Sequence, residues 1–83
     1  MKKGYIAKTV RQIMIDSNEQ YIWFGSVEIL DKCTDVLQLN HIHPLVRAKR
    51  ILDAVDRSSY FLKKYMMVEI NGKMRKVRCF CLC

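Results

Sequence analysis

The chain has 83 residues, about half of them hydrophobic (51%), so we expect one domain with a core and not a disordered chain. Three glycines and one proline argue against a loop-rich or low-complexity protein. Fifteen lysine and arginine residues against eight acidic residues give a net charge of +7. This charge favours a polyanionic partner, such as nucleic acid or an acidic membrane surface.

Targeting segments are not evident in the sequence. No apolar stretch approaches the ~20 residues of a membrane span. The lysines at positions 2 and 3 precede no apolar run, so a signal peptide is not expected either. These features predict an intracellular protein, cytoplasmic or associated with a nucleoid, with no membrane partner. Its four cysteines are then expected to be reduced thiols, unless the source is a hyperthermophile.

The first half of the chain predicts two amphipathic helices with a short strand between them. The first helix covers residues 3–16, and residues 21–24, YIWF, predict a strand of four or five residues. Ser26 is expected to cap the second helix, which runs from residue 27 to about residue 39. Apolar residues recur at helical spacing in both helices: Ile6, Val10, Ile13 and Met14 in the first, and Ile29, Leu30, Cys33, Val36 and Leu37 in the second.

Residues 44–57 predict a third helix, around which the rest of the chain is organised. Pro44 suits the first helical turn, where its missing N–H costs no hydrogen bond. One arc of this helix is apolar and is expected to pack on the core, and the opposite arc is basic and can meet an anion. The alternative is a solvated face whose charge is partly neutralised by Asp53 and Asp56. The apolar residues are Leu45, Ala48, Ile51, Leu52 and Val55, and the basic ones are Arg47, Arg50 and Arg57.

Residues 66–82 predict a β-hairpin, because Asn71-Gly72 lies between two β-like runs. A two-residue turn places Ile70 opposite Lys73, and four basic residues then lie near the turn: Lys73, Arg75, Lys76 and Arg78. The same register sets Val68 opposite Arg75 and Met66 opposite Val77. Five aromatic residues outside the turn are expected in the core: Trp23, Phe24, Tyr60, Phe61 and Tyr65.

The order helix, short strand, helix, basic helix and hairpin resembles a winged-helix DNA-binding domain over nearly the whole chain. The resemblance implies an α+β fold, with helix 44–57 in the major groove of DNA and hairpin 66–82 as the wing. The six-residue connection before the third helix is longer than in a tight helix-turn-helix. The candidate DNA-binding residues are His43, Arg47, Lys49, Arg50, Arg57, Lys73, Arg75, Lys76 and Arg78.

Within this set, physical chemistry suggests a division of labour. Arginine can form two parallel hydrogen bonds with guanine, so Arg47 and Arg50 near the start of the helix are expected to contact bases. The basic residues of the hairpin turn suit phosphates, which need positive donors at low geometric precision. The lysines at positions 2, 3, 8 and 49 would extend this phosphate track.

The predicted function is therefore double-stranded DNA binding, as a transcriptional regulator that forms a homodimer on two half-sites. We expect no enzyme activity, no catalytic residues and no cofactor. Small stand-alone regulators of this kind are typical of viruses, plasmids or archaea. The main alternative is a protein–protein interaction module that uses the same basic face, such as a phage-type inhibitor of a host protein.

The cysteines leave a second alternative, a metal or redox sensor. Cys79, Cys81 and Cys83 alternate along one strand, a spacing poorly shaped for tetrahedral metal coordination. We therefore expect Cys79 and Cys81 to be small strand residues, Cys83 a terminal thiol and Cys33 a buried hydrophobe. The ending Cys81-Leu82-Cys83 also resembles the prenylated tail of small GTPases, although no phosphate-binding loop accompanies it.

Overall fold

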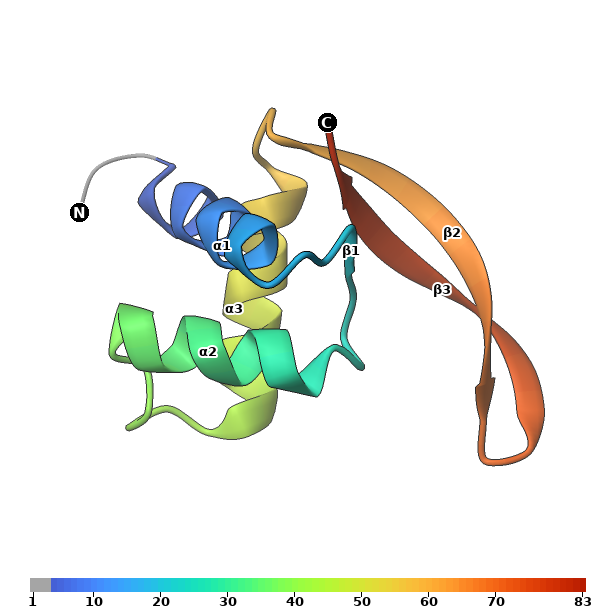
Figure 1. Cartoon of the computed structure of the whole chain (residues 1–83). Helices are drawn as coiled ribbons and strands as arrows, with labels where there is room; N and C mark the ends of the chain where they lie inside the picture. Colours follow the sequence, from blue (N-terminus) through green and yellow to red (C-terminus); the bar gives the residue numbers. More distant parts are fainter. Residues whose placement is uncertain (1–3) are drawn as a thin grey trace.

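The computed structural model describes residues 4–83. Its three helices lie beside a long hairpin that forms most of a three-stranded antiparallel sheet (Figure 1). The fold is α+β, as the sequence predicts. The elements in chain order are α1 (Tyr5–Asp16), β1 (Tyr21–Ile22), α2 (Val27–Leu37), α3 (Pro44–Asp56), β2 (Phe61–Ile70) and β3 (Lys73–Leu82).

The core lies where the three helices meet the root of the sheet. Both α1 and α2 pack against α3 (Figure 1), and α3 also contacts β2. Four of the five apolar positions predicted for α3 are buried, as are most of those in α1 and α2. This confirms the helical spacing read from the sequence. The buried side chains of this core are Ala7, Val10, Met14, Ile22, Ile29, Leu30, Cys33, Leu37, Ala48, Ile51, Leu52, Val55, Phe61 and Phe80.

The first strand is shorter than predicted. Only Tyr21 and Ile22 pair with β3, in the sheet order β1-β3-β2. Trp23 leaves the sheet because Ser26 binds both of its backbone polar groups: the Trp23 N–H donates to Ser26 Oγ at 3.1 Å, and the Ser26 N–H donates to the Trp23 carbonyl at 2.9 Å. Ser26 is the N-terminal cap residue of α2, but its hydroxyl makes no capping hydrogen bond to that helix. The predicted side-chain cap is therefore wrong.

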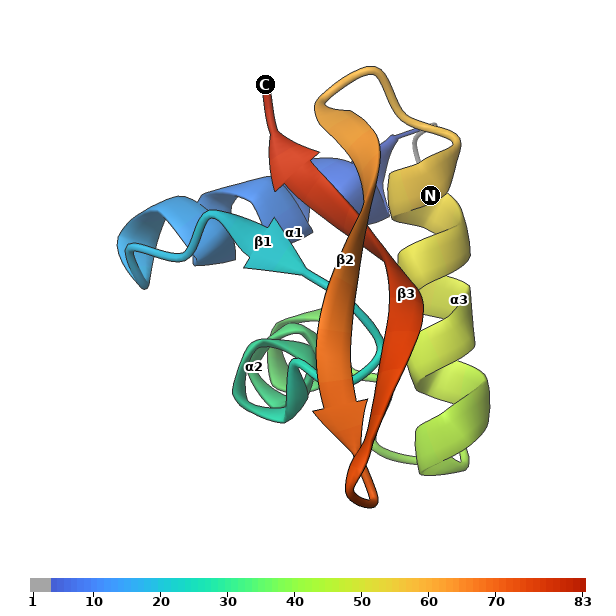
Figure 2. The same ribbon diagram turned by 90° about the vertical axis from the view of Figure 1, so that its right-hand side faces the viewer.

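The hairpin has the predicted turn and register but is longer than predicted. Asn71 and Gly72 both have positive φ angles, 53° and 78°, as a type I′ turn requires. Ile70 lies opposite Lys73 and Met66 opposite Val77, and the pairing extends back to Phe61 opposite Leu82. Figures 1 and 2 show the twisted hairpin arching away from the helices, with its tip at the end of the molecule where α3 begins.

The ends of the helices differ slightly from their predicted positions. Helix α2 stops at Leu37 because Gln38 adopts a left-handed conformation, with φ of 58°. Helix α3 ends at Asp56, and Arg57 is its C-terminal cap residue. The predicted start of the first helix at residue 3 lies outside the described residues.

Four predicted burial assignments are wrong. Val36 is 55% exposed and Leu45 60% exposed; Thr34 is buried on α2 instead, with its hydroxyl donating to the Leu30 carbonyl at 2.7 Å. Leu45 is exposed because the first turn of α3 extends beyond the buried part of the helix. Phe24 is exposed in the connection after β1, and Tyr65 lies on the part of the hairpin that has left the core.

No helix within residues 4–83 combines the length and apolar character needed to cross a membrane.

Candidate nucleic-acid interface

Positive charge is concentrated in the second half of the chain. Residues 44–83 carry ten lysine and arginine residues against three acidic residues, a net charge of +7. Residues 17–43 carry one lysine against four acidic residues, a net charge of −3. The first segment forms α3 and the hairpin, and the second contains β1 and α2. Helix α3 itself has three basic and two acidic residues, a net charge of +1, and α2 has one lysine and three acidic residues, a net charge of −2. Most of the positive charge therefore lies on the hairpin, where six basic residues stand against one acidic residue.

The middle of α3 presents two exposed cations, Lys49 and Arg50. The buried residues Ala48, Ile51 and Val55 fix the rotation of the helix, because their burial on one arc directs Arg50 to the opposite arc. Lys49 lies to one side, where it lines the groove between α3 and the hairpin. Asp53 is also exposed on this helix. The positive electrostatic potential of α3 is therefore weaker than its number of cations alone suggests.

Arg47 does not share the exposed face with Arg50, and the prediction that it does is wrong. Its side chain is half-buried, and its guanidinium Nη1 donates to the Ile42 carbonyl at 3.2 Å. The physical reason is the six-residue connection before α3, which brings this carbonyl within reach of the arginine. Through this hydrogen bond, Arg47 holds the connection against α3. The Arg47 side chain lies towards α2, where it lines a hollow together with Leu30 and Thr34.

The two ends of α3 hold the remaining helical candidates. The Nδ1 atom of His43 accepts a hydrogen bond from the Leu45 N–H at 3.2 Å, so His43 is the N-terminal cap of α3. Pro44 has no N–H, so this end of the helix retains few free donors for a phosphate. At the other end, Arg57 Nε donates to the Asp53 carbonyl at 3.3 Å. Both side chains are exposed, but each already forms a hydrogen bond with the backbone at one end of α3.

The hairpin carries the four predicted cations on exposed positions: Lys73, Arg75, Lys76 and Arg78. The Lys76 ammonium lies 4.9 Å from the centre of the Tyr65 ring, a cation–π contact that orients it. At the root of the hairpin, Lys63 Nζ lies 3.4 Å from Asp56 Oδ1 of α3. This exposed ion pair links the hairpin to α3. Lys2 and Lys3 of the predicted phosphate track lie outside the described residues.

A groove of about 490 Å³ separates α3 from the hairpin. Its floor is apolar and aromatic, and its rim carries Lys49 and Arg78, with Asp53 and Asp56 along α3. The groove was not predicted from the sequence, because the aromatic residues after β1 were expected in the core, whereas they line the groove. The signal in the sequence was Gly25-Ser26, which directly follows the two aromatic residues, at the point where the chain turns after β1. The aromatic and apolar lining residues are Trp23, Phe24, Leu52, Ile70, Val77 and Phe80.

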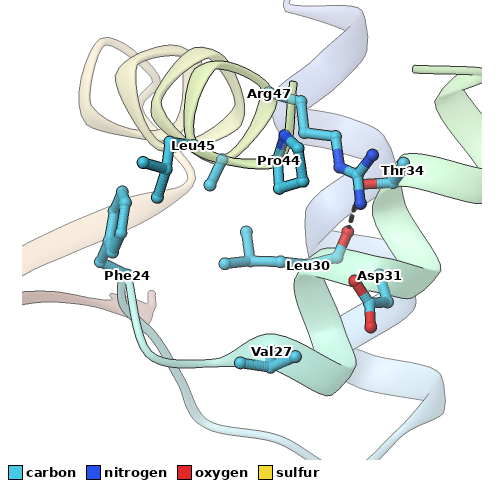
Figure 3. A pocket seen from close by; sticks show the side chains of 9 residues that line it. Phe24, Val27, Leu30, Asp31, Thr34, Pro44, Leu45 and Arg47 are labelled. Atoms are coloured by element: carbon cyan, nitrogen blue, oxygen red, sulfur yellow. Dashed lines mark hydrogen bonds between the residues drawn. The ribbon is translucent and has the colours of Figure 1, made fainter. Parts of the chain in front are cut away.

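A smaller hollow of about 200 Å³ lies between α2 and the start of α3. Figure 3 shows the Phe24 ring and Leu45 on one side of it and Leu30 opposite, with Arg47 near Thr34. The dashed line in the figure is the hydrogen bond from the Thr34 hydroxyl to the Leu30 carbonyl. Exposed apolar side chains therefore adjoin the basic helix, an arrangement that the sequence analysis did not predict.

The cysteines are four free thiols, with Cys33, Cys79 and Cys81 buried and Cys83 exposed. Burial raises the pKa of the Cys33 thiol to about 11, and burial followed by the neighbouring Cys81 raises the pKa of Cys79. Both are therefore neutral thiols at pH 7 and poor nucleophiles. In the described part of the chain, no three His, Cys, Asp or Glu side chains gather in a way that could hold a metal ion.

No family model matches the chain, and comparisons with curated proteins and with solved structures give no match.

Proposed function

We propose that this chain is a winged-helix protein that binds double-stranded DNA through α3 and the hairpin. The observation that carries the proposal is the net charge of +7 on residues 44–83, against −3 on residues 17–43. Neutralising phosphates with lysine and arginine releases counterions, which drives binding to DNA of any sequence. The order α1-β1-α2-α3-β2-β3 and the sheet order β1-β3-β2 fit the winged-helix resemblance.

In this proposal, α3 enters the major groove and the hairpin tip follows the phosphate backbone. Arg50 is the arginine placed for a base contact, since it is exposed opposite the buried arc of α3. Lys73, Arg75 and Lys76 contact phosphates. Arg47 contributes indirectly, because its hydrogen bond to the Ile42 carbonyl holds the connection that precedes α3. This assignment separates base reading from phosphate binding.

The test is fluorescence anisotropy of a labelled random duplex of about 30 base pairs, at low salt. The proposal predicts binding in the range of roughly 10⁻⁴–10⁻⁶ M. Arg50→Ala removes an exposed cation as well as the base contact, so this variant should bind even a random duplex more weakly. The Lys32→Ala variant should bind as the unaltered chain does. Lys32 is a matched control, because it is exposed on the acidic α2. Equal losses in both variants would contradict the assignment of α3.

A second candidate function is binding to an acidic protein through the same basic face. It is favoured by the exposed side chains of Phe24, Val27 and Leu45 around the smaller hollow, since apolar side chains beside a charged face are typical of protein interfaces. The anisotropy measurement separates the two candidates. Absence of duplex binding even at low salt would reject the DNA proposal and leave the protein partner.

A further inference from the structure

The outer edge of β2 is a long strand edge without a neighbour. In the sheet order β1-β3-β2, the ten residues Phe61–Ile70 pair with β3 on one side only. Within the described residues, no backbone hydrogen bond joins the other side of this strand to another element. Exposed strand edges readily pair with a further strand.

The turn determines which backbone groups point to the free edge. Ile70 and Lys73 flank the two-residue turn, so they are the residues that exchange hydrogen bonds across it. In an antiparallel ladder such pairs alternate, so the even-numbered residues of β2 bond to β3. The N–H and C=O groups of its odd-numbered residues therefore point outward. These residues are Phe61, Lys63, Tyr65, Met67 and Glu69.

We infer that this edge binds the same edge of a second copy of the chain, antiparallel and with Met66 opposite Met66. The hydrogen-bonding pattern requires odd residues to face odd residues, and this register satisfies that requirement. It places Lys63 of each copy opposite Glu69 of the other. The two-fold axis then forms two identical ion pairs, as a symmetric dimer interface requires.

Neighbouring registers lose this charge match. Centring the pairing on Tyr65 places Lys63 opposite Met67, and centring it on Met67 places Lys63 opposite Asn71. Centring it on Lys64 sets like charges directly opposite each other, which is destabilising. Lysine on an edge strand ordinarily opposes pairing, but here Lys63 has its acidic counterpart on the same face of its own strand.

Apolar side chains support the same register. Tyr65 would lie opposite Met67 of the second copy, and Leu62 opposite its Ile70. All four side chains are exposed in the single chain, with Tyr65 and Met67 each 56% exposed. Aromatic and apolar pairs across strands stabilise a sheet. The ammonium of Lys63 has three donors, so it can keep its contact with Asp56 while meeting Glu69.

The result is a continuous six-stranded sheet in the order β1-β3-β2-β2-β3-β1. The two-fold axis is perpendicular to this sheet, so both sets of helices lie on the same side of it. The hairpin tips point in opposite directions, and their cations on β3 remain outside the pairing.

Sedimentation equilibrium of the full chain at several concentrations tests the dimer. The expected species has twice the mass of the 9.8 kDa chain, and a monomer at every soluble concentration would overturn the inference. Glu69→Lys sets two lysines opposite each other at two places, so the dimer should weaken about tenfold or more. Lys63→Glu should weaken it at least as much, because it also sets a carboxylate beside Asp56. Glu28→Lys on α2, a matched charge change away from the edge, should leave the dimer intact.

A mixture of the two single variants tests the register. An equimolar mixture of Lys63→Glu and Glu69→Lys chains restores an opposite charge at both positions, so a heterodimer should form although neither variant dimerises well alone. The register would be overturned if neither substitution weakened the dimer, or if the mixture of the two variants stayed monomeric. Circular dichroism of each variant verifies that it is folded.

Disulfide trapping gives a second measurement that does not depend on charge. In a Cys83→Ser background, which removes the exposed thiol, Met66→Cys places two thiols opposite each other in a pair with closely spaced side chains. Oxidation should yield a covalent dimer. The matched control Leu62→Cys should not, because residue 62 faces residue 70 of the second copy. Equal yields from both variants would contradict the pairing.

Discussion

Fully buried side chains gather where the helices meet the root of the sheet, whereas none of the residues from Met66 to Arg78 in the hairpin is fully buried. The first region is held by apolar contacts among α1, α2, α3 and the sheet. The second is held by its backbone ladder and by the Asn71-Gly72 turn. The hairpin can therefore vary its side chains with little effect on the core, and it carries much of the exposed charge.

The largest expected difference concerns one apolar residue from each region. Ile51 on α3 is completely buried, so Ile51→Ala should lower the free energy of unfolding by about 2–5 kcal/mol. Val68 on the hairpin is half-buried, and Val68→Ala should cost less than about 1 kcal/mol. Denaturant unfolding followed by circular dichroism measures both. Similar losses would mean that the hairpin belongs to the cooperative core.

A smaller effect is expected at the turn. Gly72 has φ of 78° and no heavy atom within 4 Å of an added Cβ, so the cost of Gly72→Val comes from backbone conformation alone. We expect Gly72→Val to destabilise the hairpin by about 1–2 kcal/mol. Hydrogen exchange should then become faster in the hairpin amides and change little in α3. Gly72→Asn is the control, because asparagine tolerates positive φ. Equal acceleration in α3 would show that the hairpin and the helices unfold together.

Cys33 provides a pH test of the core. Its pKa is raised from the ordinary value of 9.0 to about 11, so the unfolded chain loses the thiol proton at lower pH than the folded one. The folded chain therefore gains stability, relative to the unfolded chain, from keeping the Cys33 thiol neutral. This gain in the free energy of unfolding is present in full below pH 9 and is lost as the pH rises towards 11. We expect a loss on the order of 1 kcal/mol by pH 10. Denaturant unfolding at several pH values should show a shallower decrease for Cys33→Ala, and an identical decrease would contradict this assignment.

The smallest stability effect separates two arginines of one helix. Arg47→Ala removes the hydrogen bond to the Ile42 carbonyl and should cost about 0.5–1.5 kcal/mol. Arg50→Ala removes an exposed side chain and should change stability by less than about 0.5 kcal/mol, while weakening DNA binding. Thermal unfolding of the two variants checks the difference. A larger loss from Arg50→Ala would mean that α3 is rotated relative to this structure.

Features of the fold that depend on neighbouring residues were predictable from the sequence, and features that depend on distant parts of the chain were not. The helices and the hairpin register were predictable, because helical spacing and the Asn71-Gly72 turn act over a few residues. Leu45 and Tyr65 were placed in the core wrongly, because their exposure depends on where distant elements end and on how the hairpin bends away.

In the candidate site too, features set by neighbouring residues were predictable and those set by distant segments were not. The exposed hairpin cations were predictable from turn position, and Arg50 from helical spacing. The role of Arg47 was not, since its hydrogen bond depends on the path of the connection before α3. The groove between α3 and the hairpin was not predictable either. It forms because β1 ends at Ile22 and because the residues after β1 lie beside α3 and the hairpin.

The salt dependence of duplex binding tests the central claim most directly. For the unaltered chain, the logarithm of the association constant should fall with the logarithm of salt concentration with a slope of several units, about 0.9 for each phosphate contact. The Lys73→Gln/Arg75→Gln variant removes two exposed cations of the hairpin, so its slope should be smaller by roughly one to two units. An unchanged slope, or no binding by the unaltered chain at low salt, would contradict the proposal that α3 and the hairpin bind DNA.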